Sequence, residues 1–174
     1  MILKLSNSKR PNKMYKEQFK TEKVMFLISM NENMKSILDK NHIDCKSLQT
    51  VALPPELNNY LERGIERRKD INCYTYKNRE IIELFYPDST GNEYSNNKVH
   101  IDTNCGITKA LEISLKFALT ILGLLDAFNH SFDIVISYDG VDFTISFYCK
   151  RDNEEWLMDD LDSYTEEAIM VITT

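Results

Sequence analysis

The sequence predicts an α+β fold: a single domain with a mostly antiparallel sheet, a central buried helix, and a C-terminal β-hairpin followed by a short helix. From Ile107 onward, "ITKALEISLKFALTILGLLDAF" repeats its apolar side chains with helical spacing. Residues 132–149, "FDIVISYDGVDFTISFYC", instead alternate apolar and polar side chains as strands do. Because helices and strands follow one another in mixed order, a doubly wound parallel sheet is not expected.

The first part of the chain is expected to supply two strands and two helices. "MILKLS" alternates as an edge strand would, and "KVMFLIS" is an apolar run of strand length. Asn31 stands where a cap is needed for a helix over "NENMKSILDKN". Pro55 begins a second helix, which is expected to end before Asp70.

Three strands are expected between that helix and Ile107. "NCYTYKNREIIELFYP" is typical of two strands joined by a turn at residues 77–79, and "KVHIDTN" is typical of a third. The polar stretch "DSTGNEYSNN" that separates them is interpreted as a loop.

Asp139 and Gly140 predict a two-residue type I′ turn in the hairpin, since that turn needs positive φ at both positions. One face of the hairpin would then be apolar and lie on the central helix, and the other, with Asp133 and Val135, would be solvated. In the closing stretch, Asp160 or Asp162 could cap a short helix. The expected cross-strand pairs are Phe132 with Phe147, Ile134 with Ile145, and Ile136 with Phe143.

Composition indicates one soluble domain over residues 1–174, with residues 1–22 as a basic arm that could be loosely attached. No apolar run reaches the roughly 18 residues of a membrane span, and no signal-peptide pattern is present. A cytoplasmic protein without a membrane partner is expected. Cys45, Cys73, Cys105 and Cys149 form no close pair, so they are expected to be reduced thiols.

Motifs for nucleotide binding, hydrolysis or a metal ion are absent, and no cofactor is expected. Cys105 at the start of the central helix, with His100 as a base, leaves a small cysteine-dependent enzyme as an alternative. Basic residues in "RGIERRKD" could contact phosphates, but acids interleave with them at helical spacing. The sequence therefore predicts no nucleic-acid partner.

Charge is distributed unevenly along the chain, whose formal net charge is −6. Residues 1–80 carry sixteen Lys or Arg against ten Asp or Glu, and residues 81–174 carry five against seventeen. The only tryptophan, Trp156, stands in the most acidic stretch, "RDNEEWLMDDLDSYTEE". Trp156 could simply be a core residue among solvated carboxylates. Alternatively, the acids could present a negative surface to a basic partner, with Trp156, Tyr164 or Tyr148 as anchors.

Residues 132–172 resemble the C-terminal part of small bacterial immunity proteins, including those of contact-dependent growth inhibition and other polymorphic toxin systems. The resemblance rests on a strand pair followed by "EEW", on "DDLDSY" and on the closing "EEAIMVI". It implies a cytoplasmic protein, not an enzyme, that binds one toxin domain and blocks it.

Together these observations predict an immunity or inhibitor protein whose partner is a basic toxin domain, with nucleases gaining most from a negative field. An acidic adaptor or oligomerisation protein is a further alternative. The residues expected to bind the partner are Asp142, Asp152, Glu154, Glu155, Asp159, Asp160 and Asp162 as charges, with Trp156 and Tyr164 as anchors.

Overall fold

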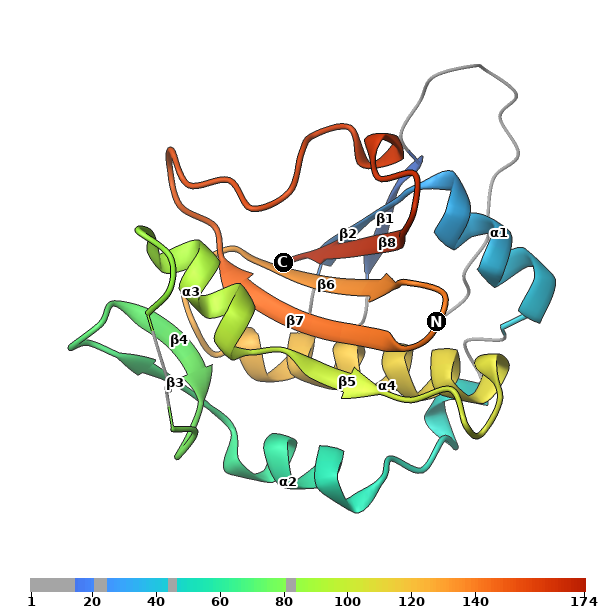
Figure 1. The fold of residues 1–174 in the computed structure, drawn as a ribbon. Helices are drawn as coiled ribbons and strands as arrows, with labels where there is room; N and C mark the ends of the chain where they lie inside the picture. Colours follow the sequence, from blue (N-terminus) through green and yellow to red (C-terminus); the bar gives the residue numbers. More distant parts are fainter. Residues whose placement is uncertain (1–14, 21–24, 44–46, 81–83) are drawn as a thin grey trace.

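The fold was analysed in a computed structural model, which describes residues 15–20, 25–43, 47–80 and 84–174 (Figure 1). The α+β class predicted from the sequence is confirmed. The expected strand at "MILKLS" lies outside the described residues. The helices are α1 (Glu32–Asn41), α2 (Pro55–Arg63), α3 (Ser89–Asn96) and α4 (Ile107–Leu125), with 3₁₀ turns η1 (Ser47–Gln49) and η2 (Leu161–Ser163). The strands are β1 (Tyr15–Lys20), β2 (Met25–Met30), β3 (Ile65–Arg68), β4 (Cys73–Tyr76), β5 (Val99–Ile101), β6 (Phe132–Tyr138), β7 (Phe143–Cys149) and β8 (Ala168–Thr173).

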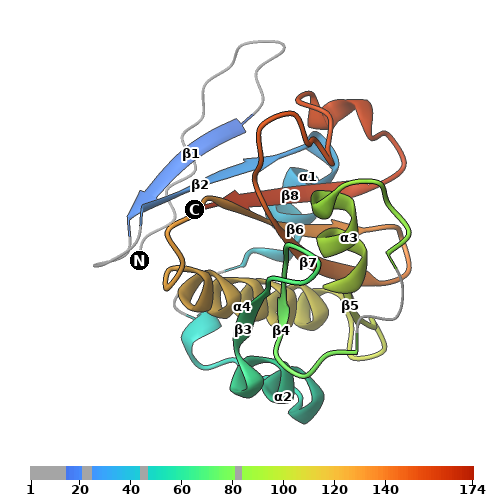
Figure 2. The same ribbon diagram turned by 90° about the vertical axis from the view of Figure 1, so that its left-hand side faces the viewer.

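Six of these strands form one antiparallel sheet in the order β1-β2-β8-β6-β7-β5, and β3 and β4 form a separate hairpin. β1, which falls within the expected basic arm, is one edge strand of this sheet (Figure 2), and β5 is the other. β8 is inserted between β2 and β6, so the closing strand of the described chain lies inside the sheet.

α4 covers one face of the sheet, called here the helix face, and α2 lies on the far side of α4 (Figure 1). The predicted central helix is thus confirmed, and its side chains Leu111, Phe117 and Ile121 are fully buried. Fully or nearly fully buried side chains of the sheet meet it: Phe132, Ile134, Ile136, Phe143, Ile145, Phe147, Met170 and Ile172.

The predicted register of the β6–β7 hairpin is wrong by two residues. Ile134 pairs with Phe147 and Ile136 with Ile145, so four residues, 139–142, form the connection. The Asp139 carboxylate accepts hydrogen bonds from the backbone N–H groups of Val141 and Asp142, at 2.9 and 3.0 Å, and this favours the longer loop. Because the shift is even, the same side chains still face α4.

The opposite face of the sheet, called here the polar face, was predicted to be solvated, and that prediction is wrong. Asp133, Val135, Ser146 and Tyr148 on this face are all buried. They are covered by α3 and by residues 150–167, called here the acidic segment, which crosses above the strands in Figure 1. Val135 and Tyr148, apolar or aromatic among polar neighbours, were the sequence signals for such a cover.

Local errors have clear physical causes. The second helix ends at Arg63, because Gly64 at φ 75° terminates it, and Arg67 and Arg68 lie in β3 instead. β4 pairs with β3, and residues 84–86 are not in a strand; residues 81–83 lie outside the description. The predicted loop at 88–97 contains α3, whose cap is the Asp88 side chain.

Two residues predicted to cap helices do so in the structure. Asn31 caps α1, and its side-chain oxygen accepts from the backbone N–H of Met34 at 3.0 Å. Asp160 caps η2 through the backbone N–H of Asp162. The residues after that turn form β8 rather than a longer helix.

Candidate functional site

The acidic segment is anchored to the fold at its start by a buried ion pair. Arg151 donates to both carboxylate oxygens of Glu93 in α3, at 2.9 and 2.6 Å, and the Glu93 side chain has no exposed surface. Glu93 also accepts from the backbone N–H groups of Tyr74 and Cys149. Burial raises the pKa of Glu93, and the hydrogen bonds from Arg151 oppose that rise. This pair connects α3, β4 and β7 at one point.

The other end of the acidic segment is fixed by two residues near the start of α1. Asn31 donates to the backbone carbonyls of Tyr164 and Glu167 and accepts from the backbone N–H of Ile169. The Asp162 carboxylate accepts from the backbone N–H of Glu32, the first residue of α1. An acid at this position also meets the positive end of the helix dipole.

Trp156 lies in the middle of the acidic segment. The sequence left open whether it is a core residue or an exposed anchor, and in the structure it is partly buried. Its ring packs on Tyr94 of α3 with centroids 4.5 Å apart, and the ring of Tyr86 meets it edge-on at 5.0 Å. Leu84 and Phe85, which precede Tyr86, are 54% and 69% exposed. Trp156 therefore connects the buried side chains of the polar face, which include Tyr94, to the exposed apolar residues 84–86.

The residues predicted to bind a partner do not have equal access to solvent. Glu154 is directed inward, where it accepts from the backbone and hydroxyl of Thr90 at 2.9 and 2.7 Å. Tyr164 is half-buried, and its hydroxyl accepts from the backbone N–H of Met158. Asp142 stands before β7 and Asp152 after it, so about 20 Å of strand separates them. The exposed acids of the acidic segment are Asp152, Glu155, Asp159, Asp160, Asp162, Glu166 and Glu167.

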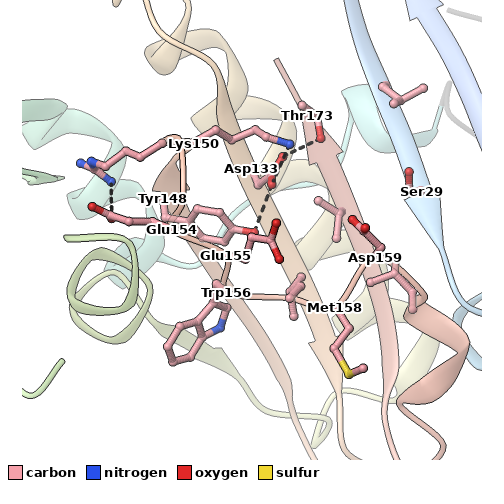
Figure 3. Close-up of a pocket in the computed structure, with 15 residues that line it drawn as sticks. Ser29, Asp133, Tyr148, Lys150, Glu154, Glu155, Trp156, Met158, Asp159 and Thr173 are labelled. Atoms are coloured by element: carbon pink, nitrogen blue, oxygen red, sulfur yellow. Dashed lines mark hydrogen bonds and ion pairs between the residues drawn. The ribbon is translucent and has the colours of Figure 1, made fainter. Parts of the chain in front are cut away.

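A pocket of about 310 Å³ opens between the acidic segment and the polar face (Figure 3). Its floor is one cross-strand row of the sheet: the register sets Asp133 between Thr173 of β8 and Tyr148 of β7. Its wall is residues 154–159 of the segment, with Trp156 and Met158 among them.

Asp133 is the buried charge at the floor of this pocket, 6% exposed. Its cross-strand neighbours both donate to it, Thr173 at 2.6 Å and Tyr148 at 3.1 Å. Burial and the Asp133 charge raise the pKa of the Tyr148 hydroxyl, which keeps it protonated as a donor. The Lys150 ammonium lies 3.6 Å from the second carboxylate oxygen. Sequence reasoning missed Asp133 because it treated this face as solvated.

The residues of the alternative cysteine enzyme are both at the surface. Cys105 is exposed and precedes Gly106, the cap of α4, and His100 lies in β5 with a ring nitrogen 3.4 Å from the Thr144 hydroxyl. No hydrogen bond joins Cys105 to His100, both of which belong to the described part of the chain. Within that part, no group of three His, Cys, Asp or Glu side chains is placed to hold a metal ion.

Comparisons with known proteins add a family and little else. No helix among the described residues has the length and apolarity to cross a membrane. A search of curated proteins finds no match, and a search of solved structures finds none either. One family model matches residues 29–174, which include α1 to α4 and the acidic segment. The chain therefore belongs to the Uncharacterized protein PM0498 family.

Proposed function

We propose that this protein is a cytoplasmic immunity or inhibitor protein, not an enzyme, that binds a cognate bacterial toxin domain and blocks it. The observation that carries the proposal is the acidic segment, which combines seven exposed carboxylates with the exposed Met158 and the partly buried Trp156. Large apolar side chains inside a polar rim are the usual arrangement of a protein-binding surface.

The apolar centre of this surface has two parts. Met158 is 61% exposed on the segment itself, and Leu84, Phe85 and Tyr86 are exposed on the chain before α3. The Tyr86 ring contacts Trp156, which links residues 84–86 to the acidic segment two positions before Met158. A partner that covers them would remove apolar area from water at roughly 25 cal/mol per Å².

The charge around this centre favours a basic partner. Between residues 152 and 167 there are eight acids and no Lys or Arg. Such a field raises the association rate with a positively charged protein, and a nuclease domain presents positive charge to its substrate. Occlusion of that surface would neutralise the toxin without any chemistry by the inhibitor.

The test is a growth assay in a bacterium that expresses the C-terminal domain encoded by the gene immediately upstream. We expect the domain to stop growth and co-expression of this protein to restore it. The proposal would be contradicted if the domain does not stop growth, or if it stops growth and this protein does not restore it. Either result would favour the adaptor alternative.

Charge reversal locates the surface. Asp152→Lys with Asp159→Lys, at two exposed positions of the acidic segment, should leave the fold intact, slow association several-fold and weaken its dependence on salt. The matched control is Glu56→Lys with Glu62→Lys on exposed positions of α2, beyond α4 from the sheet. Equal association rates for the two double variants would place the interface elsewhere.

A further inference from the structure

We propose that the pocket above Asp133 binds a guanidinium or ammonium group at the end of an aliphatic chain, and that a basic side chain of the partner supplies it. The source of the cation rests on the proposed function. The pocket's preference for such a cation rests on its own residues and can be tested without the partner.

The floor of the pocket offers a buried carboxylate with acceptor capacity to spare. A carboxylate has about four acceptor positions. Two are filled, by the hydroxyls of Thr173 and Tyr148. Both donors are neutral, so they orient Asp133 without neutralising its charge, which water only partly solvates at this depth. The site is thus preorganised for a cation.

Lys150 is the cation that now faces this carboxylate. Its ammonium is 3.6 Å from the Asp133 oxygen, beyond the roughly 2.7–2.9 Å of a charge-assisted hydrogen bond. Its side chain is 51% exposed. Lys150 can therefore move into solvent at low cost when a better-placed cation arrives, and its departure returns the pocket to a net negative charge.

The other charges of the pocket leave an excess of acid. Arg151 is occupied by Glu93, and Glu154 is bound to Thr90. Glu155 and Asp159 are exposed at the rim. Figure 3 shows Glu155 and Asp159 among the side chains of the acidic segment that line the pocket, with Asp133 on the sheet below them. An entering cation would meet the exposed acids Glu155 and Asp159 before the buried Asp133.

The walls suit the aliphatic stem of a long basic side chain. Trp156, Leu157 and Met158 line one side, and Val171 lines the sheet side. Lysine and arginine bury their methylene groups along such surfaces. A volume of about 310 Å³ is at the lower end of ligand pockets and holds one side chain with water.

Trp156 makes the first test direct, since it is the only tryptophan and lines the pocket. The purified protein is titrated with n-butylguanidinium and with n-butylurea, its neutral counterpart, while tryptophan fluorescence is recorded. We expect a saturable change with butylguanidinium and at least tenfold weaker binding of butylurea. Equal responses to both probes, or to neither, would overturn the proposal.

Variants assign the response to the pocket. Asp133→Asn keeps one oxygen as an acceptor and presents an NH₂ group to the other hydroxyl, which can accept from it, so the variant should fold and weaken butylguanidinium binding at least tenfold. Glu155→Gln, at an exposed position, should weaken it several-fold without any effect on folding. Lys150→Met should strengthen it, because the competing ammonium is removed. Asp126→Asn, exposed after α4, is the matched control and should change nothing.

The growth assay then identifies the source of the cation. Rescue that is lost with Asp133→Asn but kept with Asp126→Asn would support a side chain of the partner. Full rescue by a folded Asp133→Asn variant would overturn that assignment and make a free small amine the ligand. If the wild-type protein gives no rescue, the proposed function fails, while the titration still decides whether the pocket takes a cation.

Discussion

The two faces of the central sheet are both buried, but by different means. On the helix face, aliphatic and aromatic side chains of β6 and β7 meet α4, and Ile134, Ile136 and Phe147 are completely inaccessible. On the polar face, the same strands bury Asp133 and Ser146 beneath α3 and the acidic segment. The helix face is stabilised by the burial of apolar area. The polar face also needs a hydrogen-bond partner for each buried polar group. We therefore expect the helix face to contribute most of the free energy of folding, and the polar face to fix the positions of the polar side chains.

Phe147→Ala should have the largest effect on stability. Phe147 is fully buried against Tyr76 and the α4 core. Its truncation leaves a cavity and should lower the free energy of unfolding by about 3–5 kcal/mol. The measurement is urea unfolding. Tyr148→Phe, the neighbouring residue on the polar face, should cost only about 1 kcal/mol, through the lost hydrogen bond to Asp133. Similar losses for both would erase the contrast between the faces.

Glu93→Gln should have the next largest effect, about 3 kcal/mol, because it leaves Arg151 charged and 15% exposed without its ion-pair partner. The same unfolding experiment measures it. Glu154→Gln is the comparison, since Glu154 is 4.0 Å from the same guanidinium and more exposed. It should cost about 1 kcal/mol. The reverse order would mean that Glu154, not Glu93, anchors the acidic segment.

Asn31→Ala should cost about 2 kcal/mol, because one amide both caps α1 and holds the end of the acidic segment. Hydrogen exchange should show faster opening at the N–H of Ile169, which bonds to Asn31. Asn33→Ala provides the control: its amide reaches Thr165 and Glu167 from an exposed position and should contribute little.

The smallest expected effect concerns Asp139 in the β6–β7 loop. Hydrogen bonds from the N–H groups of Asp142 and Val141 lower its pKa. A carboxyl with a lower pKa in the folded state adds stability above its unfolded pKa, near 3.8, and loses it as pH falls through the folded value. NMR titration should find the Asp139 midpoint below 3.8. Asp139→Asn should remove this part of the acid dependence.

Sequence periodicity was sufficient where one physical effect dominates. The helix from Ile107 and the strand character of β6 and β7 follow from hydrophobic pattern alone, and the cap at Asn31 follows from local hydrogen bonding. The register of the hairpin did not follow, because the Asp139 side chain stabilises a longer loop than the Asp-Gly pair suggested.

The candidate site was predicted in part. The acids and Trp156 were recognised from composition, and most of those acids are exposed. Glu154 and Asp162 were counted as free charges, but long-range bonds to Thr90 and Glu32 occupy them. Asp133, Lys150 and the exposed Leu84 to Tyr86 were missed, because their roles depend on strand order and on how residues 150–167 cross the sheet. One sequence does not encode such placement in any local pattern.

The position of β8 has a consequence for how the protein comes into being on the ribosome. β8 is the strand that joins the pair β1–β2 to β6, β7 and β5, with Met30 paired to Met170 across most of the chain. Until residues 168–173 have been synthesised and have left the exit tunnel, β2 and β6 each present an open edge that can pair with other chains. Such long-range closure is also slow. The sheet can therefore close only after residues 168–173 have emerged from the ribosome, and chaperones that shield strand edges would have a defined interval in which to act.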